Sequence, residues 1–545
     1  MSCCKSCSVF SGFGVILCLS LLVLAPAPRA DEWTGTLGDD VISYDDNEFA
    51  RGVQITTSSD GGVLHCLWAE DAPSVRELHY GRSTDWGVTW SSAASDRVIS
   101  YSDGNDLYEE CDVVAFGDGG VAVVWSEDHT NTREVHFGLS FDDGDTWSCT
   151  SADQLLSDPG TLAETGVPSI AADLQGALHV VWHQMSPAGT AEVHYGRSTD
   201  NGVTWTSQSA DRVISFPDGQ AALDPKITAT GGRLYVIWRE ADDSGDPRIH
   251  VGISSDGGFT WSSASADRTI SPAAELMTDH EISSVGFGPE NGVLVVYRAS
   301  YNTSAPFYYE IYSTYTFDEG ATWTGESTLT PVSYDEGAGR SASNPDVFVR
   351  DMSGAWAVWD EEDDVAGTKE QHVSHFDGPT WSGATEDVII SFPDGENGYR
   401  PSITGHHWVT AQDRDRDFPV LCVVWTEYTG GSTDNYEVHQ SILDATVGAV
   451  EPIAEPQAAW ARVRPSVGEG AAHLDFSLEQ PGPVTLSIFD AQGRLIHESR
   501  SMLAAGGHTL TWNGRGADGR RAPAGRYTAR LRAGERTIEL PLIRF

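Results

Sequence analysis

The chain has 545 residues, with 33 Lys and Arg against 80 Asp and Glu, so its formal net charge is −47 at pH 7. A surface this acidic repels nucleic-acid phosphates and anionic lipid headgroups, which excludes DNA or RNA binding. The hydrophobic share of 40% and the aromatic share of 10% can build a buried core, so the chain is expected to fold.

The first thirty residues predict a secretory signal peptide. Lys5 precedes the short apolar run "VILCLSLLVLA", and small residues follow up to Ala30. We therefore expect a secreted or bacterial cell-surface protein with no membrane span in the mature chain. The cysteines outside this segment form no CxxC or His–Cys cluster, so we expect buried thiols, no cofactor and no metal site. These cysteines are Cys66, Cys111, Cys149 and Cys422.

An internal repeat follows, in which a strand-like run ends in an aromatic residue: "HCLWAE", "AVVWSE", "HVVWHQ", "YVIWRE", "LVVYRA", "WAVWDE" and "CVVWTE". Each run precedes a second alternating strand, a turn, and a run such as "DRVIS". Period-two alternation with Gly and Asp turns indicates an all-β fold. Seven copies with four strands each predict a seven-bladed β-propeller over residues 31–449. The repeated aromatics are Trp68, Trp125, Trp182, Trp238, Tyr297, Trp359 and Trp425.

The two ends of the repeat complement each other. The seventh copy stops after "EVHQSILDATVG", whereas the segment after Trp33 matches the last part of the other copies. We expect this N-terminal segment to supply the outer strand of the seventh blade and so to close the ring.

The turn of the repeat has the form Ser/Thr-x-Asp-x-Gly-x-Thr-Trp. Its carboxylate can accept backbone N–H bonds, its Gly permits a positive φ, and its Trp can pack between blades. A degenerate sixth copy is "SHFDGPTW". The full copies carry Asp85, Asp142, Asp200, Asp256 and Asp318.

This turn resembles the Asp-box (BNR) repeat of the sialidase-like propeller superfamily, over roughly residues 33–447. The resemblance implies that the five Asp are structural and lie away from the active face. It also implies a protein that binds or processes extracellular glycans, including glycoside hydrolysis of the exo-sialidase type. The alternative is a non-catalytic surface propeller that binds protein or glycan as an adhesion module.

In that superfamily three Arg bind the substrate carboxylate. A Tyr activated by a Glu attacks the sugar, and an Asp serves as the general acid. The resemblance places Tyr399 as the candidate nucleophile, with Glu281 or Glu361 as its partner. The candidate substrate-binding residues are Arg51, Arg298, Arg340 and Arg400.

Two of these expectations depend on local sequence. Arg400 precedes a proline, which favours extended backbone, so we expect it in an inner strand as the best single anchor for a ligand, with a structural ion pair as the alternative. Glu127 follows a strand end, so we expect it on the ligand face, where a change to Gln would leave stability unchanged. The Asp-rich loop 241–247 lacks the EF-hand spacing, so it predicts no specific Ca²⁺ site.

A charge shift marks the C-terminal region. Residues 461–545 have a net charge of +4, whereas the rest of the chain has −51. We therefore expect a linker at 450–465 and a separate domain at 466–545. Its alternating strands resemble the immunoglobulin-like module of flagellar hook-capping proteins and type IX secretion sorting domains, which implies the secretion machinery as a partner. The alternative is a spacer or a carbohydrate-binding β-sandwich.

Overall fold

The computed structural model describes residues 33–443 and 461–544, apart from short gaps at 35–39, 45–47, 59–60, 72–74, 93–96, 103, 118, 130–131, 158–164, 187–188, 209–211, 243, 275, 286–291, 301–307, 327–328, 334–339, 352–353, 363–367, 377–379, 383–387, 393–395, 406–420, 429–435, 466–471, 479–481, 491–493, 504–505, 517–519, 523–524 and 534–535. The predicted signal peptide and most of the predicted linker lie outside the described residues. The chain divides into two compact units, Met1–Gly448 and Ala449–Phe545.

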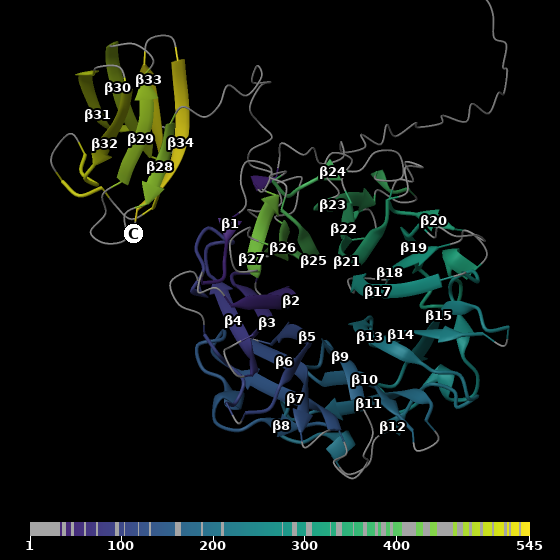
Figure 1. Cartoon of the computed structure of the whole chain (residues 1–545). Coiled ribbons are helices and arrows are strands. Elements are labelled where there is room, and N and C mark those ends of the chain that lie inside the picture. The colour runs from purple at the N-terminus through teal and green to yellow at the C-terminus, as the bar shows by residue number, and fades with distance from the viewer. Residues whose placement is uncertain are drawn as a thin grey trace, which may run out of the picture. The chain divides into compact units, whose positions relative to one another are not determined.

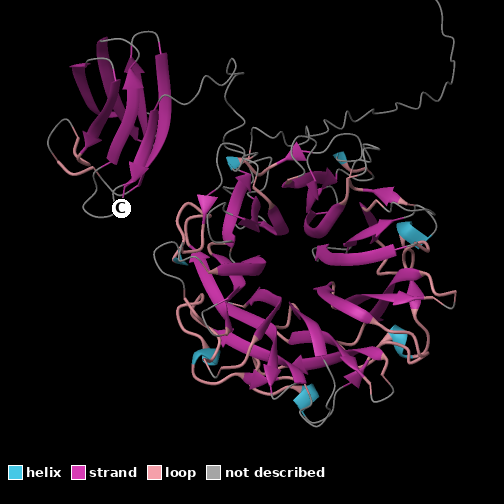
Figure 2. Cartoon of the chain, viewed as in Figure 1, coloured by secondary structure: helices cyan, strands magenta, loops and turns pink. Residues whose placement is uncertain are grey.

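Strands make up almost all of the regular structure (Figure 2). Short 3₁₀ turns directly follow four of the Asp-box Trp residues, at Ser148–Thr150, Thr206–Gln208, Ser262–Ala264 and Thr324–Glu326. Among the described residues, no helix is long and apolar enough to cross a membrane.

The first unit consists of antiparallel sheets that follow one another in chain order around a common centre (Figure 1). Sheet 2 contains β5 (Leu107–Phe116), β6 (Gly120–His129), β7 (Thr132–Ser140) and β8 (Gln154–Leu155). Sheet 3 contains β9 (Thr165–Ala172), β10 (Leu178–Met185), β11 (Ala191–Ser198) and β12 (Arg212–Val213). Sheet 4 contains β13 (Leu223–Thr230), β14 (Arg233–Ala241), β15 (Pro247–Ser254) and β16 (Arg268–Thr269).

The next two sheets repeat this arrangement, and the first strand of each sheet is nearest the centre in Figure 1. Sheet 5 contains β17 (Leu276–Val285), β18 (Gly292–Ser300), β19 (Glu310–Thr316) and β20 (Thr330–Pro331). Sheet 6 contains β21 (Ala342–Asp351), β22 (Gly354–Glu362), β23 (Lys369–Phe376) and β24 (Val388–Ile389). The unit is therefore all-β and propeller-like.

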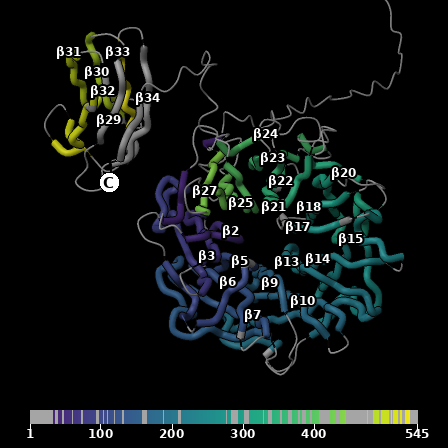
Figure 3. Tube along the Cα trace, viewed as in Figure 1, coloured from purple at the N-terminus to yellow at the C-terminus, as the bar shows by residue number. Residues whose placement is uncertain are grey.

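The two ends of the repeat meet at one place. Sheet 1 contains β2 (Phe49–Thr57), β3 (Leu64–Asp71) and β4 (Arg76–Ser83), and sheet 7 contains β25 (Gly398–Gly405), β26 (Leu421–Tyr428) and β27 (Tyr436–Leu443). One parallel pair, Phe49 with Tyr436, joins these two sheets. The N-terminal strand β1 (Asp40–Val41) pairs antiparallel with β27, and Figure 3 shows it in purple beside the green end of the repeat. It thus holds the outer position in sheet 7 that β8 holds in sheet 2.

The core lies between neighbouring sheets. The repeated aromatic of each second strand is fully buried, because its ring faces the preceding sheet. Trp125, for example, belongs to one cluster with Leu67, Leu78 and Tyr80 of sheet 1. The four described cysteines are buried free thiols, as predicted. Since each face is covered only by the next sheet, no sheet can bury its core alone.

A serine at the end of each "VIS"-type run fixes the outer strand to the third strand. In sheet 2 the Ser157 hydroxyl accepts the backbone N–H of Val135 at 3.1 Å. Ser43 makes the equivalent contact with Val438 at 2.9 Å, so the N-terminal segment is attached to sheet 7 as the other outer strands are attached to theirs. The remaining serines are Ser100, Ser215, Ser271, Ser333 and Ser391.

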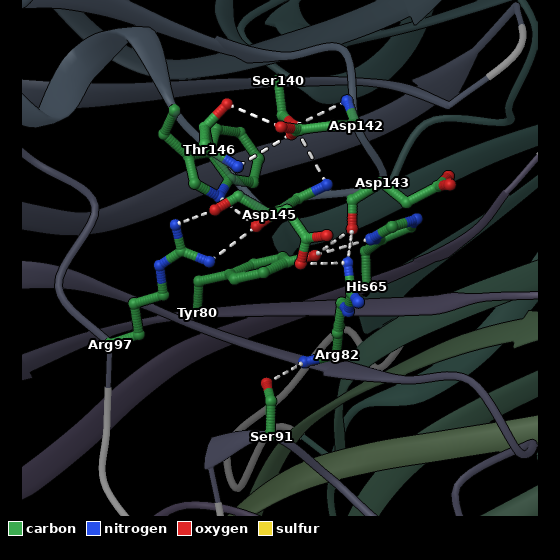
Figure 4. A network of polar contacts seen from close by, with 12 residues as sticks. His65, Tyr80, Arg82, Ser91, Arg97, Ser140, Asp142, Asp143, Asp145 and Thr146 are labelled. Atoms are coloured by element: carbon green, nitrogen blue, oxygen red, sulfur yellow. Dashed lines mark hydrogen bonds and ion pairs between the residues drawn. The ribbon is translucent and has the colours of Figure 1, made fainter.

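The Asp boxes form hydrogen-bonded turns, one of which is drawn in Figure 4. The Asp142 carboxylate accepts the backbone N–H of Thr146 at 2.8 Å and the hydroxyls of Thr146 and Ser140 at 2.7 and 2.8 Å. Asp143 and Gly144 both have a positive φ, of 52° and 81°. The backbone turns that tightly because Gly carries no side chain and the carboxylate satisfies the exposed N–H.

Each Asp box also contacts the preceding sheet. Arg97 donates to the backbone oxygens of Gly144 and Asp145 at 2.7 and 2.6 Å (Figure 4). A Cβ built on Gly144 would overlap the Tyr80 hydroxyl, so only Gly fits there. The Trp147 ring meets the Tyr80 ring edge-on at 5.0 Å. The turn therefore fastens sheet 2 to sheet 1.

The second unit is a small β-sandwich with its own core. One sheet contains β28 (Ala461–Pro465), β29 (Ala472–Leu478) and β32 (Gly506–Trp512). The other contains β31 (Leu495–Leu503), β30 (Gly482–Asp490), β33 (Gly525–Ala533) and β34 (Arg536–Arg544). Trp512 and Tyr527 pack at 5.1 Å within a cluster that also includes Leu486 and Leu531.

We predict that Trp147→Ala destabilises the first unit by about 3–5 kcal/mol, because it empties a buried ring site between two sheets. Urea denaturation followed by tryptophan fluorescence measures the loss. Val203→Ser, at a 70% exposed position in another Asp box, is the control and should change stability little. Equal losses in both variants would contradict the role given to the Asp-box Trp.

The Asp boxes also predict an acid dependence. The Thr260 hydroxyl and backbone N–H lower the pKa of Asp256 to about 2. A carboxyl whose folded-state pKa is depressed contributes stability above its unfolded-state value, and this contribution is lost as the pH falls through the folded-state value. Between pH 5 and about pH 2.5, wild type should therefore lose more free energy of unfolding than Asp256→Asn. Asp143→Asn, at the position where the next box has Asn201, should behave as wild type; a wild-type slope in Asp256→Asn would refute the prediction.

Candidate functional site

The inner strands share a β-bulge near their first residues, at the end of the sheets opposite to the Asp boxes. The register of β13 and β14 shifts between Leu223 and Lys226, and Asp224 in the bulge has a φ of 54°. Residues other than Gly adopt such a left-handed conformation only where the surroundings impose it. The equivalent left-handed residues are Gly52, Val167, Asp279, Asn344 and Arg400.

Arg400 departs from its prediction. It does lie in the inner strand β25, but its φ is 53° and not extended. The bulge outweighs the preference imposed by Pro401, because the register of β25 and β26 shifts at this point. The Arg400 side chain is exposed, and its backbone N–H donates to Asp360 at 3.2 Å.

Two residues after each bulge position, polar side chains form a girdle that connects neighbouring inner strands. Lys226 and Glu281 form an ion pair at 2.8 Å between sheets 4 and 5. Asp346 accepts the hydroxyl of Ser402 at 2.9 Å, which connects sheets 6 and 7. Burial, and then the charge of Glu281, raises the pKa of Asp346. The full girdle is Gln54, Asp112, Ser169, Lys226, Glu281, Asp346 and Ser402. Glu281, predicted as a catalytic partner, is thus a member of this structural girdle.

Glu361 also has a structural position. It is 2% exposed and accepts the indole N–H of Trp359 at 2.7 Å. Glu127 does the same with Trp125 at 2.8 Å, so its expected place on the ligand face is wrong. The sequence misleads here because a side chain at a strand end can fold back onto the residue two positions earlier. The same pairing recurs at Trp68–Glu70, Trp182–Gln184, Trp238–Glu240 and Trp425–Glu427.

Two of the predicted substrate-binding arginines have acidic partners. Arg51 lies 3.3 Å from Asp71, and its guanidinium is 5.4 Å from the ring centroid of Phe49. Arg298 lies 3.1 Å from Asp279 and covers the Tyr309 ring at 3.9 Å.

Arg340, which precedes β21, is half-buried. Burial, followed by the charge of Arg340, lowers the pKa of His372 to about 3.

Four aromatic rings meet where sheets 7 and 1 join, and we call them the aromatic rim. Phe49 starts β2, Tyr399 lies in β25, Tyr428 ends β26 and Tyr436 starts β27. Tyr436 is central, with ring centroids at 5.8 Å from Phe49, 6.1 Å from Tyr399 and 5.5 Å from Tyr428. All four side chains are half-buried. The structure thus brings Tyr399 and Arg51 to one surface.

Charged groups surround the aromatic rim. The Lys369 ammonium lies 5.3 Å from the Tyr399 ring and forms an ion pair with Asp360 at 2.6 Å. Burial, followed by the neighbouring Tyr436 and Asp360, raises the pKa of Tyr399. A raised pKa disfavours the phenolate, which is the opposite of what a nucleophile needs. The arrangement suits stacking and hydrogen bonding better than covalent attack.

A separate hollow lies between sheets 3 and 4 at the Asp-box end. Its lining includes Arg197, Arg233, Asp173 and Asp256. Arg233 forms an ion pair with Glu319, and Arg197 lies 4.8 Å from the ring of Phe259. These contacts hold the Asp-box turns in place, so we assign the hollow to the scaffold.

Comparison with known proteins identifies both units. Residues 150–346 match the BNR repeat-like domain, and residues 461–536 match the FlgD Ig-like domain. The chain therefore contains a BNR repeat-like domain followed by a FlgD Ig-like domain. No curated protein matches the chain.

Solved structures with similarity to the chain include two glycoside-active enzymes and a lyase. The Penicillium chrysogenum alpha-L-arabinanase complexed with arabinobiose is 14% identical, covers 77% of this chain and 99% of its own, and has a TM-score of 0.43. The Trypanosoma rangeli sialidase in complex with the inhibitor DANA is 12% identical, covers 95% and 89%, and has a TM-score of 0.41. The polysaccharide lyase Uly1 is 9% identical, covers 72% and 89%, and has a TM-score of 0.45.

The pairing of Glu361 with Trp359 generates a prediction. Glu361→Ala removes the acceptor of a buried indole N–H and should cost about 1–3 kcal/mol of unfolding free energy. Glu361→Gln should lose clearly less, since Gln184 accepts the same bond from Trp182 at 3.0 Å in sheet 3. Denaturant unfolding compares the two; indistinguishable losses would count against the hydrogen bond as the reason for a buried Glu.

Proposed function

We propose that the first unit is an extracellular glycan-binding propeller and that the aromatic rim holds the sugar. The observation that carries this proposal is the cluster of Phe49, Tyr399, Tyr428 and Tyr436, whose half-buried rings lie within 6.1 Å of Tyr436. Aromatic faces stack on the C–H faces of sugar rings, and phenolic hydroxyls donate and accept hydrogen bonds.

The charges support a neutral sugar as the ligand. Recognition of a sialic acid carboxylate requires guanidinium groups that can turn to the ligand. In this chain Arg51 and Arg298 lie against Asp71 and Asp279, and the unit as a whole is strongly acidic. An anionic sugar would meet repulsion at such a face.

Binding without hydrolysis is supported by the positions of the candidate catalytic groups. Glu281 is engaged by Lys226 and Glu361 by Trp359, while burial raises the pKa of Tyr399. Hydrolysis of the exo-sialidase type therefore stands as the second candidate. The observation in its favour is that Tyr399 and Arg51 contact the same aromatic rim, through Tyr436 and Phe49.

We further propose that the seven sheets form a closed seven-bladed propeller and that the protein is exported. The pairing of β1 with β27 and the contact of Ser43 with Val438 support closure. The predicted signal peptide and the FlgD Ig-like domain support export, with residues 466–545 acting as a sorting domain for secretion machinery.

Binding to a glycan array by the purified chain tests the proposed function. We expect retention of neutral glycans, and Tyr399→Ala should weaken binding at least about tenfold, or about 1.4 kcal/mol. Tyr101→Ala is the control, because Tyr101 is an exposed aromatic in the loop before sheet 2 and is not part of the aromatic rim. A fluorogenic sialoside should remain intact; its hydrolysis, abolished by Tyr399→Phe, would establish the second candidate instead. Absence of any glycan binding would refute both.

A further inference from the structure

A buried polar cluster in sheet 4 lies apart from the aromatic rim. Glu240 is in β14, His250 is in β15, and Asp267 directly precedes β16. One ligand atom of each residue lies within 4.8 Å of those of the other two. Glu240 and His250 are 2% and 5% exposed. The cluster faces sheet 3, since Trp238, which lies against His250, packs into the core shared by sheets 3 and 4.

The orientation of each carboxylate is fixed from outside the cluster. Trp238 donates to Glu240 Oε2 at 2.7 Å, and the backbone N–H of Phe216, in the loop after sheet 3, donates to Asp267 Oδ1 at 3.1 Å. The second oxygens, Glu240 Oε1 and Asp267 Oδ2, are buried. Both ring nitrogens of His250 are buried too and have no hydrogen-bond partner among the described residues. A neutral imidazole and two carboxylate oxygens therefore share one buried space.

Little in the surroundings compensates the two carboxylates. Arg248, whose charge acts on His250, is itself held by Asp242 at 2.6 Å. Asp218, from the loop after sheet 3, adds a third acidic charge that acts on Glu240, His250 and Asp267. Buried like charges of this kind are stable when a cation or a shared proton lies between them.

We propose that Glu240, His250 and Asp267 bind a divalent transition-metal ion of the Zn²⁺ class between sheets 3 and 4. One imidazole nitrogen and two carboxylate oxygens form a common zinc ligand set, with bonds of about 2.0–2.2 Å. Three protein ligands leave the fourth position of a tetrahedral site to water. The imidazole disfavours Ca²⁺, which takes oxygen ligands. Since Phe216 and Asp218 belong to the loop after sheet 3, the ion fastens that loop to sheet 4.

Comparison of the repeats shows which sheets carry the cluster, since sheet 3 keeps Trp182 opposite His194 but has Gln184 at the Glu position. Sheet 2 brings Glu127, His136 and Asp153 into the same arrangement, and the backbone N–H of Tyr101 from the preceding loop donates to Asp153 at 3.2 Å. Sheet 5 has none of the four residue types, Trp, Glu, His and Asp, at the corresponding positions. The register places Tyr297 opposite Tyr312, as Trp238 is opposite His250. The sheet 5 residues at the Trp, Glu, His and Asp positions are Tyr297, Ala299, Tyr312 and Leu329.

Zinc binding by the full chain tests the proposal. The chain is stripped with a chelator, desalted and titrated calorimetrically with Zn²⁺ alone and, separately, with Ca²⁺ alone. Glu240→Gln and His250→Gln should each bind one Zn²⁺ fewer than wild type, and Zn²⁺ should raise the thermal midpoint of wild type more than that of either variant. Any Ca²⁺ binding should be the same in wild type and in Glu240→Gln.

Two features of sheet 3 keep the test interpretable. Gln184 replaces Glu there and still accepts the Trp182 indole N–H at 3.0 Å, so Glu240→Gln is expected to fold. His194→Gln, in that sheet, is the matched control and should keep the wild-type number of Zn²⁺ ions. An equal number of bound Zn²⁺ in wild type and Glu240→Gln would overturn the proposal and leave a shared proton between Glu240 and Asp267. Loss of Zn²⁺ in the control as well, or Ca²⁺ binding that depends on Glu240, would also overturn it.

Discussion

The burial of one aromatic ring per sheet against the preceding sheet is the constraint on which the first unit depends. Trp125 of sheet 2 is covered by Leu67 and Tyr80 of sheet 1, and the other repeated aromatics are equally buried. A four-stranded sheet with such a face is unstable in water unless a neighbour covers it. Trp68 of sheet 1 is covered in the same way by Val424 and Val438 of sheet 7, the sheet to which the N-terminal strand β1 pairs. The Asp boxes serve the same contact, because Gly144 and Trp147 bring the turn of sheet 2 against Tyr80 of sheet 1, and Gly202 and Trp205 bring the next turn against Phe137 of sheet 2.

Features set by local sequence could be predicted. Period-two alternation specifies strands, and the Asp boxes are closed by contacts within five residues, such as Asp142 with Thr146. The girdle could not be predicted, because its members come from separate inner strands and only the packing of sheet 4 against sheet 5 brings Lys226 to Glu281. The same holds for the aromatic rim. Tyr399 was predicted as a site residue, whereas Phe49, Tyr428 and Tyr436 lie far from it in sequence or at strand ends that carry no motif.

The errors lie at strand ends and bulges, where the local sequence does not fix the conformation. Glu127 and Glu361 stand at strand ends, where exposure is the ordinary expectation, but each turns back to the indole N–H two residues earlier. Arg400 precedes a proline, yet the bulge shared by the inner strands forces a positive φ. In both cases an interaction repeated around the unit outweighs a local preference. A repeat is therefore best interpreted by comparing its copies at one register position.

That comparison also separates scaffold from function. At the register position that ends the second strand, sheet 1 places Asp71 opposite Arg76, and the two form an ion pair at 2.6 Å. Sheet 2 places Asp128 opposite Arg133 at the same position. Sheet 7 instead places Tyr428 opposite Tyr436, and their rings meet at 5.5 Å. In sheet 1 an ion pair occupies this position, so strand pairing alone does not require aromatic residues there. Their neighbours Phe49 and Tyr399 extend the same apolar surface across the junction of sheets 7 and 1. The departure from the repeat thus coincides with a surface where four half-buried rings gather, and this coincidence is the strongest argument for a ligand at the aromatic rim.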